Sequence, residues 1–256
     1  MTNWCDTHIH LDAPELNGQG LDLLPAAQKC GINKFVVPGV LVSSWDGMVA
    51  LAENAESVYL APGLHPAYAD QWTPEAEQLL QYMTASQKVV AIGEIGLDGS
   101  VKSSMQQQEV VLRAQLQIAL DARLPVLLHA RQATGQLLAI LRELEIGKKI
   151  GGSWHGFSGS LQVAQELAEL GFKIGVGPIL LRANARKLPD AVKALPTSAL
   201  VLETDLPYMA EKPEIILKVA EKVAELRHCS LAETARFTTE NANKLFGFQD
   251  RSIYGK

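Results

Sequence analysis

The chain has few cysteines, no long apolar run and no excess of basic residues. Its three cysteines are scattered along the sequence, without the paired spacing of a disulfide framework or of a zinc knuckle. No apolar stretch approaches the roughly 18 residues that span a bilayer. The first twelve residues also lack the pattern of a signal peptide. These absences favour a reduced, cytoplasmic protein that is not embedded in a membrane.

The charge balance is acidic, with a formal net charge of −5. Proteins that coat nucleic acid usually have a basic surface, because their affinity comes largely from neutralising phosphates. A nucleic-acid substrate would therefore have to be held locally, by metal ions and a few cationic side chains. The length of 256 residues matches the roughly 250 residues of a one-domain (β/α)₈ barrel, so we predict one domain over residues 1–256.

Short β-branched or aliphatic runs recur along the chain, and each is followed by a longer helical pattern. Such alternation predicts parallel strands joined by right-handed crossovers. Eight units in this length favour a closed barrel over an open sheet, so the predicted fold class is α/β, a single-domain (β/α)₈ TIM barrel. The predicted strands are Trp4–Ile9, Lys34–Pro38, Val58–Pro62, Val89–Glu94, Pro125–His129, Ile150–His155, Phe172–Val176 and Leu200–Thr204.

Helix signals agree with this alternation. The apolar residues of Met105–Ala122 repeat with the helical period. Thr73 followed by Pro74 is typical of an N-cap with proline in the first helical position. After the eighth strand, Pro213–Arg227 and Leu231–Phe246 are predicted to be two closing helices.

Metal-ligand residue types follow several of the predicted strands. His8 and His10 stand two residues apart at the end of the first strand, where both imidazoles can bind one cation. Each histidine taken alone is better explained as a buried core residue. Six ligand-type residues at five strand ends instead favour a metal site at the C-terminal face of a barrel. They are His8, His10, Glu94, His129, His155 and Asp205.

These motifs make the chain resemble the TatD family of metal-dependent hydrolases and deoxyribonucleases, within the amidohydrolase-like barrel superfamily. The resemblance runs from residue 6 to residue 207. GEIGLD and ETD-x-P are its most specific motifs. The matching segments are DTHIH at 6–10, GLHP at 63–66, GEIGLD at 93–98, LPVLLHAR at 124–131, HGFSG at 155–159 and LETDLP at 202–207.

The resemblance implies a site for two divalent cations. It implies that His8, His10 and Asp205 hold the first cation, and that His129 and His155 hold the second. Glu94 would bridge the two, because a carboxylate has two oxygens and can span a pair of ions. Nitrogen ligands suit zinc or manganese, whereas magnesium prefers oxygen ligands, although the family is usually described as magnesium-assisted. The identity of the ions among Zn, Mn and Mg therefore stays open.

Further roles can be assigned around this centre. Asp205 is the candidate catalytic base beside Glu94, because a carboxylate at a metal can orient a water and accept its proton. Arg131 is a candidate to bind a substrate phosphate through its planar fork, with an ion pair as the alternative. His65 is a candidate substrate contact. Asp6 is expected to orient a ligating imidazole through that ring's second nitrogen.

Three functions remain open from the sequence. The leading one is a TatD-type deoxyribonuclease that cleaves phosphodiester bonds of single-stranded DNA. The second is hydrolysis of a small ester, amide or lactone, favoured by the acidic balance and by the short segment after Asp205. The third is a non-catalytic metal-binding protein, which the complete ligand set disfavours. The oligomeric state cannot be read from the sequence.

Overall fold

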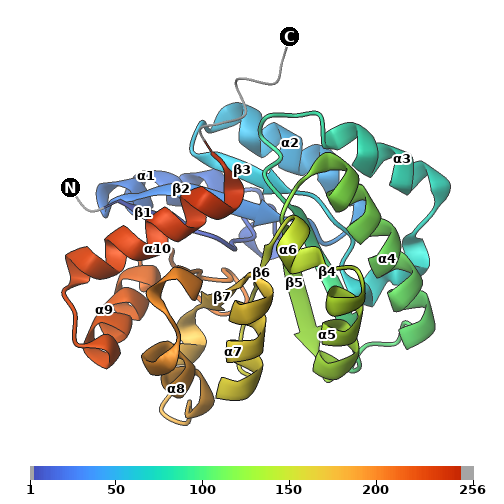
Figure 1. Cartoon of the computed structure of the whole chain (residues 1–256). Coiled ribbons are helices and arrows are strands. Elements are labelled where there is room, and N and C mark those ends of the chain that lie inside the picture. The colour runs from blue at the N-terminus through green and yellow to red at the C-terminus, as the bar shows by residue number, and fades with distance from the viewer. Residues whose placement is uncertain (1–2, 249–256) are drawn as a thin grey trace.

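The computed structural model describes residues 3–248 as a ring of parallel strands surrounded by helices (Figure 1). Residues 1–2 and 249–256 of the predicted domain lie outside the described residues. Within each of two sections, β1–β3 and β4–β8, every strand pairs in parallel with the next along the chain, and the predicted fold class is confirmed. The strands are β1 (Trp4–Asp6), β2 (Ile32–Pro38), β3 (Val58–Ala61), β4 (Ile92–Asp98), β5 (Val126–Arg131), β6 (Gly152–Trp154), β7 (Phe172–Val176) and β8 (Leu200–Leu202).

Helices fill the connections and cover the outside of the ring. The longest, α4, has the bounds predicted from its periodicity, and α10 matches the second closing helix. The α-helices are α1 (Leu24–Lys29), α2 (Trp45–Asn54), α3 (Pro74–Met83), α4 (Met105–Ala122), α5 (Thr134–Glu143), α6 (Ile146–Lys149), α7 (Leu161–Leu170), α8 (Lys187–Ala194), α9 (Ile215–Arg227) and α10 (Leu231–Phe246). Short 3₁₀ helices are η1 (Pro14–Leu16), η2 (Gly20–Leu23), η3 (Val42–Ser44), η4 (Pro66–Gln71), η5 (Pro178–Leu181) and η6 (Thr197–Ala199).

Local chemistry explains several helix ends. The Thr73 hydroxyl accepts the backbone N–H of Ala76, so the predicted N-cap of α3 is confirmed. Helix α9 begins at Ile215 and not at Pro213 as predicted. None of the helices that the structure describes combines the length and hydrophobicity needed to cross a bilayer.

The ladder of strands runs in two sections, β1–β3 and β4–β8, joined by short contacts. Between β3 and β4, one bridge pairs Leu60 with Val89. Between β8 and β1, the N–H of Thr7 donates to the carbonyl of Leu202 at 3.0 Å. The two sections therefore meet through a few backbone contacts and not through a continuous ladder.

The bounds of β4 differ from the prediction and matter for the site. This strand begins at Ile92 and continues to Asp98, so Glu94 lies inside the strand and not at its end. Its register against β5 shifts between Ile92 and Ile95, and such an irregularity can redirect side chains next to an active site. His129 likewise lies within β5, whereas the ladder of β1 ends at Asp6 and leaves His8 and His10 in the following loop.

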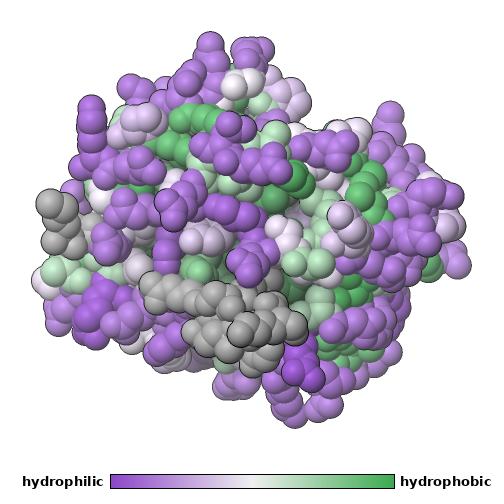
Figure 2. Space-filling view, turned by 90° about the horizontal axis from the view of Figure 1, so that it is seen from above, coloured by the Kyte–Doolittle hydropathy of each residue, from purple (hydrophilic) through white to green (hydrophobic). Residues whose placement is uncertain are grey.

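Two of the three apolar clusters in the described residues hold the barrel together. The larger one lies between the strands and the surrounding helices. The smaller one brings together Cys5 of β1, Val36 of β2 and Leu127 of β5, strands on different sides of the ring, and so fills the lumen. Phe246 at the end of α10 belongs to it and is 1% exposed. On the face seen in Figure 2, hydrophilic side chains predominate and hydrophobic ones appear between them.

Candidate functional site

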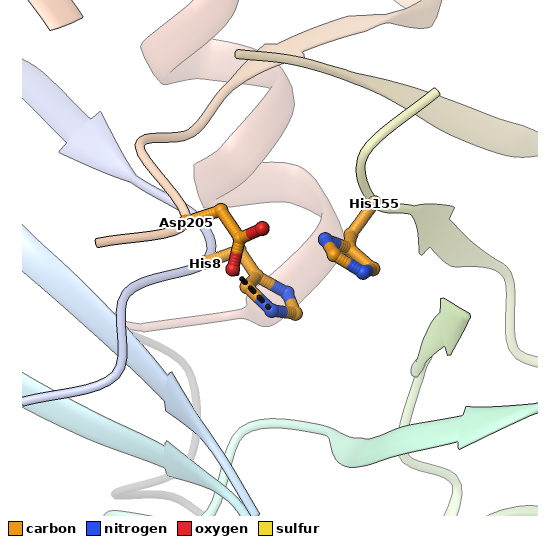
Figure 3. Close-up of side chains that lie close together, drawn as sticks. All are labelled: His8, His155 and Asp205. Carbon is orange, nitrogen blue, oxygen red and sulfur yellow. Dashed lines mark ion pairs between the residues drawn. The ribbon is translucent and has the colours of Figure 1, made fainter. Parts of the chain in front are cut away.

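Six polar side chains converge where the strands end, opposite the part of the lumen that α10 closes. They come from segments far apart in the chain, as Figure 3 shows for three of them. Their burial is high for ionisable groups: His8 is 0% exposed and Glu94 only 3%. The contributors are His8 and His10 after β1, Glu94 in β4, His129 in β5, His155 after β6 and Asp205 after β8.

Glu94 lies between two pairs of histidines, and its two oxygens face different pairs. Its Oε1 lies 2.7 Å from His129 Nδ1 and 2.8 Å from His155 Nε2. Its Oε2 lies 3.4 Å from His8 Nε2 and 3.9 Å from His10 Nε2. One carboxylate thus connects both halves of the cluster.

Asp205 closes the half formed by His8 and His10. Its Oδ1 is 3.4 Å from His10 Nε2. The same oxygen is 3.8 Å from His8 Nε2 (Figure 3). The two Nε2 atoms of His8 and His10 are only 3.2 Å apart. Two nitrogens that face each other beside two carboxylates form the arrangement that a divalent cation can bind.

Three overlapping groups of side chains in the described residues have ligand atoms close enough to share an ion. They are His8 with His155 and Asp205, His8 with His10 and Glu94, and His65 with Glu94 and His129. These ligand atoms fit divalent cations, because each group combines a carboxylate with imidazoles that can bind a cation in their neutral form.

The protein's own charges couple these groups strongly. Burial alone would raise the pKa of Glu94, but His155, His129 and His8 outweigh it and hold that pKa well below its ordinary value. Burial opposes charge on His155 too, yet Glu94 raises the pKa of His155 to about 10. Burial and the charge of His155 lower the pKa of His8 to about 4. The cluster therefore holds a carboxylate and an imidazolium on one side and a neutral imidazole on the other.

His65 approaches the same cluster from the loop after β3. Its Nε2 lies 3.8 Å from Glu94 Oε1, and its Nδ1 accepts the backbone N–H of Ala67. Burial lowers the pKa of His65 to about 4, so the ring is neutral near pH 7. With Nδ1 as an acceptor, the proton of the neutral ring is on Nε2, and His65 presents a hydrogen-bond donor to the site.

Arg131 is the last residue of β5, two positions beyond His129, and it is exposed. In the ladder it pairs with Asp98 of β4. Within the described residues, its guanidinium group forms no hydrogen bond or ion pair. The ion pair considered as its alternative role is therefore not found within residues 3–248.

The expectation for Asp6 is wrong. Its Oδ1 accepts the backbone N–H groups of His8 and Thr204, and its Oδ2 accepts the Thr204 hydroxyl at 2.6 Å. The Nδ1 atoms of His8 and His10 have no hydrogen-bond partner among the described residues. Asp6 thus fixes the backbone where β1 and β8 end and does not orient an imidazole, because the strand stops before His8.

Two further acidic residues, Asp98 and Glu203, lie next to the predicted ligands. Asp98 Oδ2 lies 3.0 Å from His129 Nε2, on the side of the ring away from Glu94. Its carboxylate also accepts the N–H and hydroxyl of Ser100. Glu203 lies in the lumen, buried beneath the site, and accepts the N–H of Gly156. The signal for Asp98 was its spacing of four from Glu94, which places both on one face of a strand that continues beyond Glu94.

A barrel that gathers histidines and carboxylates at the C-terminal ends of its strands defines the class of metal-dependent hydrolases. Comparison with known proteins gives the family. The model of the TatD-related DNase family matches residues 5–247, nearly the whole chain. The chain therefore belongs to the TatD-related DNase family, and the predicted membership is confirmed.

Individual relatives agree. The chain is 34% identical over 250 residues to the uncharacterized metal-dependent hydrolase YabD of Bacillus subtilis, covering 94% of this chain and 98% of that one. It is 28% identical over 261 residues to the 3'-5' ssDNA/RNA exonuclease TatD of Citrobacter rodentium, covering 96% and 99%. The crystal structure of YjjV, a TatD homolog from Escherichia coli, superposes with a TM-score of 0.90 at 35% identity, covering 96% and 98%. The expectation of a metal-dependent hydrolase is confirmed.

Proposed function

We propose that the chain is a two-metal phosphodiesterase that removes nucleotides from the ends of single-stranded nucleic acid. The main observation behind this proposal is the position of the Glu94 carboxylate between two pairs of histidines. One oxygen faces His129 and His155, and the other faces His8 and His10. A carboxylate whose two oxygens face different sets of ligands can bridge two cations. Pairs of bridged cations support in-line displacement at phosphorus. The name of the Citrobacter relative supports single-stranded DNA or RNA as the substrate.

The residues would share two ions in the following way. His8, His10 and Asp205 would hold the first, His129 and His155 the second, and Glu94 both. Bound cations of this type acidify a water, polarise the scissile group and neutralise developing charge. Zinc or manganese suits a set of four imidazoles and two carboxylates better than magnesium does.

The side chains supply the remaining chemistry. Burial alone would raise the pKa of Asp205, but its hydrogen bond from His10 and the charge of His155 lower it. Asp205 is therefore ionised near neutral pH and can accept the proton of an attacking water. His65 donates its Nε2–H to a substrate oxygen. Arg131, exposed beyond His129, binds a phosphate oxygen through its fork.

The test is hydrolysis of end-labelled single-stranded oligonucleotides with zinc, manganese or magnesium, run beside the Glu94→Ala variant. We expect turnover that stops with a chelator, returns with metal and is absent in Glu94→Ala. Labels at the 5′ and 3′ ends report the polarity. Metal binding without hydrolysis of any oligonucleotide, ester or amide would contradict an enzymatic role.

A second function is favoured by the charge around the site entrance. Tyr208 is 54% exposed, and its ring lies edge-on to His10 at 5.0 Å. Burial of part of the ring and the nearby charges of Glu15 and Asp12 raise the pKa of Tyr208 to about 12. Acidic neighbours repel a polyanion more than a small neutral ester, amide or lactone. Turnover of such small substrates but of no oligonucleotide would support this alternative.

The state of the cysteines supports a proposal for the cellular compartment of the protein. Cys5, Cys30 and Cys229 are all free. Free thiols are the usual state in the reducing cytoplasm, and we assign the protein to that compartment.

A further inference from the structure

Glu203 is a buried carboxylate that the proposed chemistry does not use. It follows β8 and is 1% exposed. Its side chain enters the lumen next to Gly175 of β7, where even a single added Cβ would collide with the Glu203 carboxylate. The barrel thus leaves room for this carboxyl group, although a buried polar group without a partner is unfavourable. We therefore expect a nearby hydrogen-bond donor that could pair with this carboxylate.

Only one of its two oxygens has a hydrogen-bond partner in the described residues. Glu203 Oε1 accepts the backbone N–H of Gly156 at 2.6 Å, the residue directly after His155. Glu203 Oε2 is buried and has none. A free acceptor therefore lies beside the turn that carries His155.

His155 has a buried nitrogen that lacks a hydrogen-bond partner in the described residues. Its Nε2 faces Glu94 Oε1 at 2.8 Å, whereas its Nδ1 is buried and has no partner within residues 3–248. A buried donor and a buried acceptor, each without a partner, thus lie on adjoining segments.

The other histidine of this half of the cluster provides a precedent within the same molecule. His129 presents Nδ1 to Glu94, and Asp98 Oδ2 lies 3.0 Å from its Nε2. A carboxylate behind a ligating imidazole fixes which nitrogen carries the proton and how the ring is turned. Asp98 has this geometry for His129, and Glu203 is the matching carboxylate for His155.

We propose that Glu203 is a positioning residue for His155, whose Nδ1–H it holds from Oε2 through one bridging water. That contact would keep the lone pair on His155 Nε2, the nitrogen that faces Glu94, available to a cation. The inference rests on the proposed metal centre. It gives the first residue of the ETD motif a role of its own, separate from that of Asp205.

The decisive variant is Glu203→Gln. Glutamine keeps the shape and an oxygen for the Gly156 N–H, but the atom that replaces Oε2 is now a donor. The bridging water then accepts from the amide and can turn a hydrogen toward His155 Nδ1, which favours the proton on Nε2, the nitrogen that would bind the cation. We expect binding of one of the two ions, measured by calorimetry with zinc or manganese, to weaken about 10–100-fold. The melting temperature of the metal-free protein should stay near that of the parent, because glutamine keeps the shape and the hydrogen bond from the Gly156 N–H.

Glu214→Gln is the matched control. Glu214 also has a buried carboxylate oxygen without a hydrogen-bond partner within residues 3–248. No hydrogen bond or ion pair of those residues links it to the cluster. This control should bind both ions like the parent. Asp98→Asn should weaken binding to a similar extent as Glu203→Gln.

The outcomes separate the two levels of the proposal. If the parent binds no ion, the metal centre itself is wrong. If the parent binds two ions and Glu203→Gln binds them equally well, Glu203 is only a packing residue. Should Glu203→Gln not fold, the imidazole proton of His155 in the zinc-loaded parent decides by NMR. A slowly exchanging Nδ1–H supports the contact, and exchange at the solvent rate overturns it.

Discussion

The two ends of the barrel lumen use the same inward-facing positions for opposite purposes. At the end closed by α10, side chains such as Cys5, Val36 and Phe246 form an apolar cluster. At the other end, equally buried positions carry His8, Glu94 and Glu203. Apolar burial stabilises the fold, whereas buried ionisable groups oppose it unless they are paired. The polar end is thus the part of the molecule that a bound cation would stabilise.

The largest effect is expected from Glu94→Ala, which removes the group shared by both halves of the polar end. Activity should fall by more than the ~10²–10⁴-fold that loss of proton transfer alone causes, because the ions are lost as well. Activity and metal content, measured together, check this. Glu94→Ala protein that still carries two ions would show that the carboxylate does not bridge them.

Asp205→Asn should separate catalysis from folding within that same end. The amide keeps the shape but cannot accept the proton, so turnover should drop by about 10²–10⁴-fold while the circular dichroism spectrum stays that of the parent. Rates are compared at saturating metal, so that weaker ion binding does not imitate the effect. Equal rates for variant and parent would remove Asp205 as the base.

Phe246→Ala tests the apolar end. Truncation of this side chain, 1% exposed, should lower the free energy of unfolding by about 3–5 kcal/mol and leave the metal affinity unchanged. Denaturant titration and calorimetry measure the two quantities. Tyr82→Ala is the control, since Tyr82 is 80% exposed and should change stability by no more than about 0.5 kcal/mol. Weaker metal binding in Phe246→Ala would mean that the two ends are not independent.

His65→Ala should weaken substrate interactions without removing metal. Loss of a hydrogen bond to a charged group corresponds to about 1.5–3 kcal/mol, so kcat/KM should fall roughly 10–150-fold. Metal content, measured in the same preparation, should equal that of the parent. A loss of one ion would instead make His65 a ligand, as its proximity to Glu94 and His129 also allows.

The same contrast explains what the sequence could predict. The strand–helix alternation and the ligand-type residues were visible because apolar periodicity and residue type are local properties. The positions of Glu94 within β4 and of His8 beyond β1 were missed, because a register shift and an early end of the ladder depend on the neighbouring strands. Asp6 was assigned to an imidazole for the same reason. The environment of Glu203 depends on Gly175 and Gly156, which lie on other strands and loops.

The smallest expected effect is the release of a proton when a metal ion binds. It follows from the unequal pKa values of the histidines at the polar end. With a pKa of about 10, His155 carries a proton at pH 7 in the ion-free protein, whereas His8, with a pKa of about 4, does not. A cation binds only the neutral imidazole, so binding should release the proton of His155 and none from His8. The dissociation constant should then rise about tenfold per released proton for each unit by which pH falls, or about 1.4 kcal/mol. Calorimetry in two buffers of different ionisation enthalpy counts the protons directly, and binding that releases none would mean that His155 is already neutral and that Glu94 does not hold its charge.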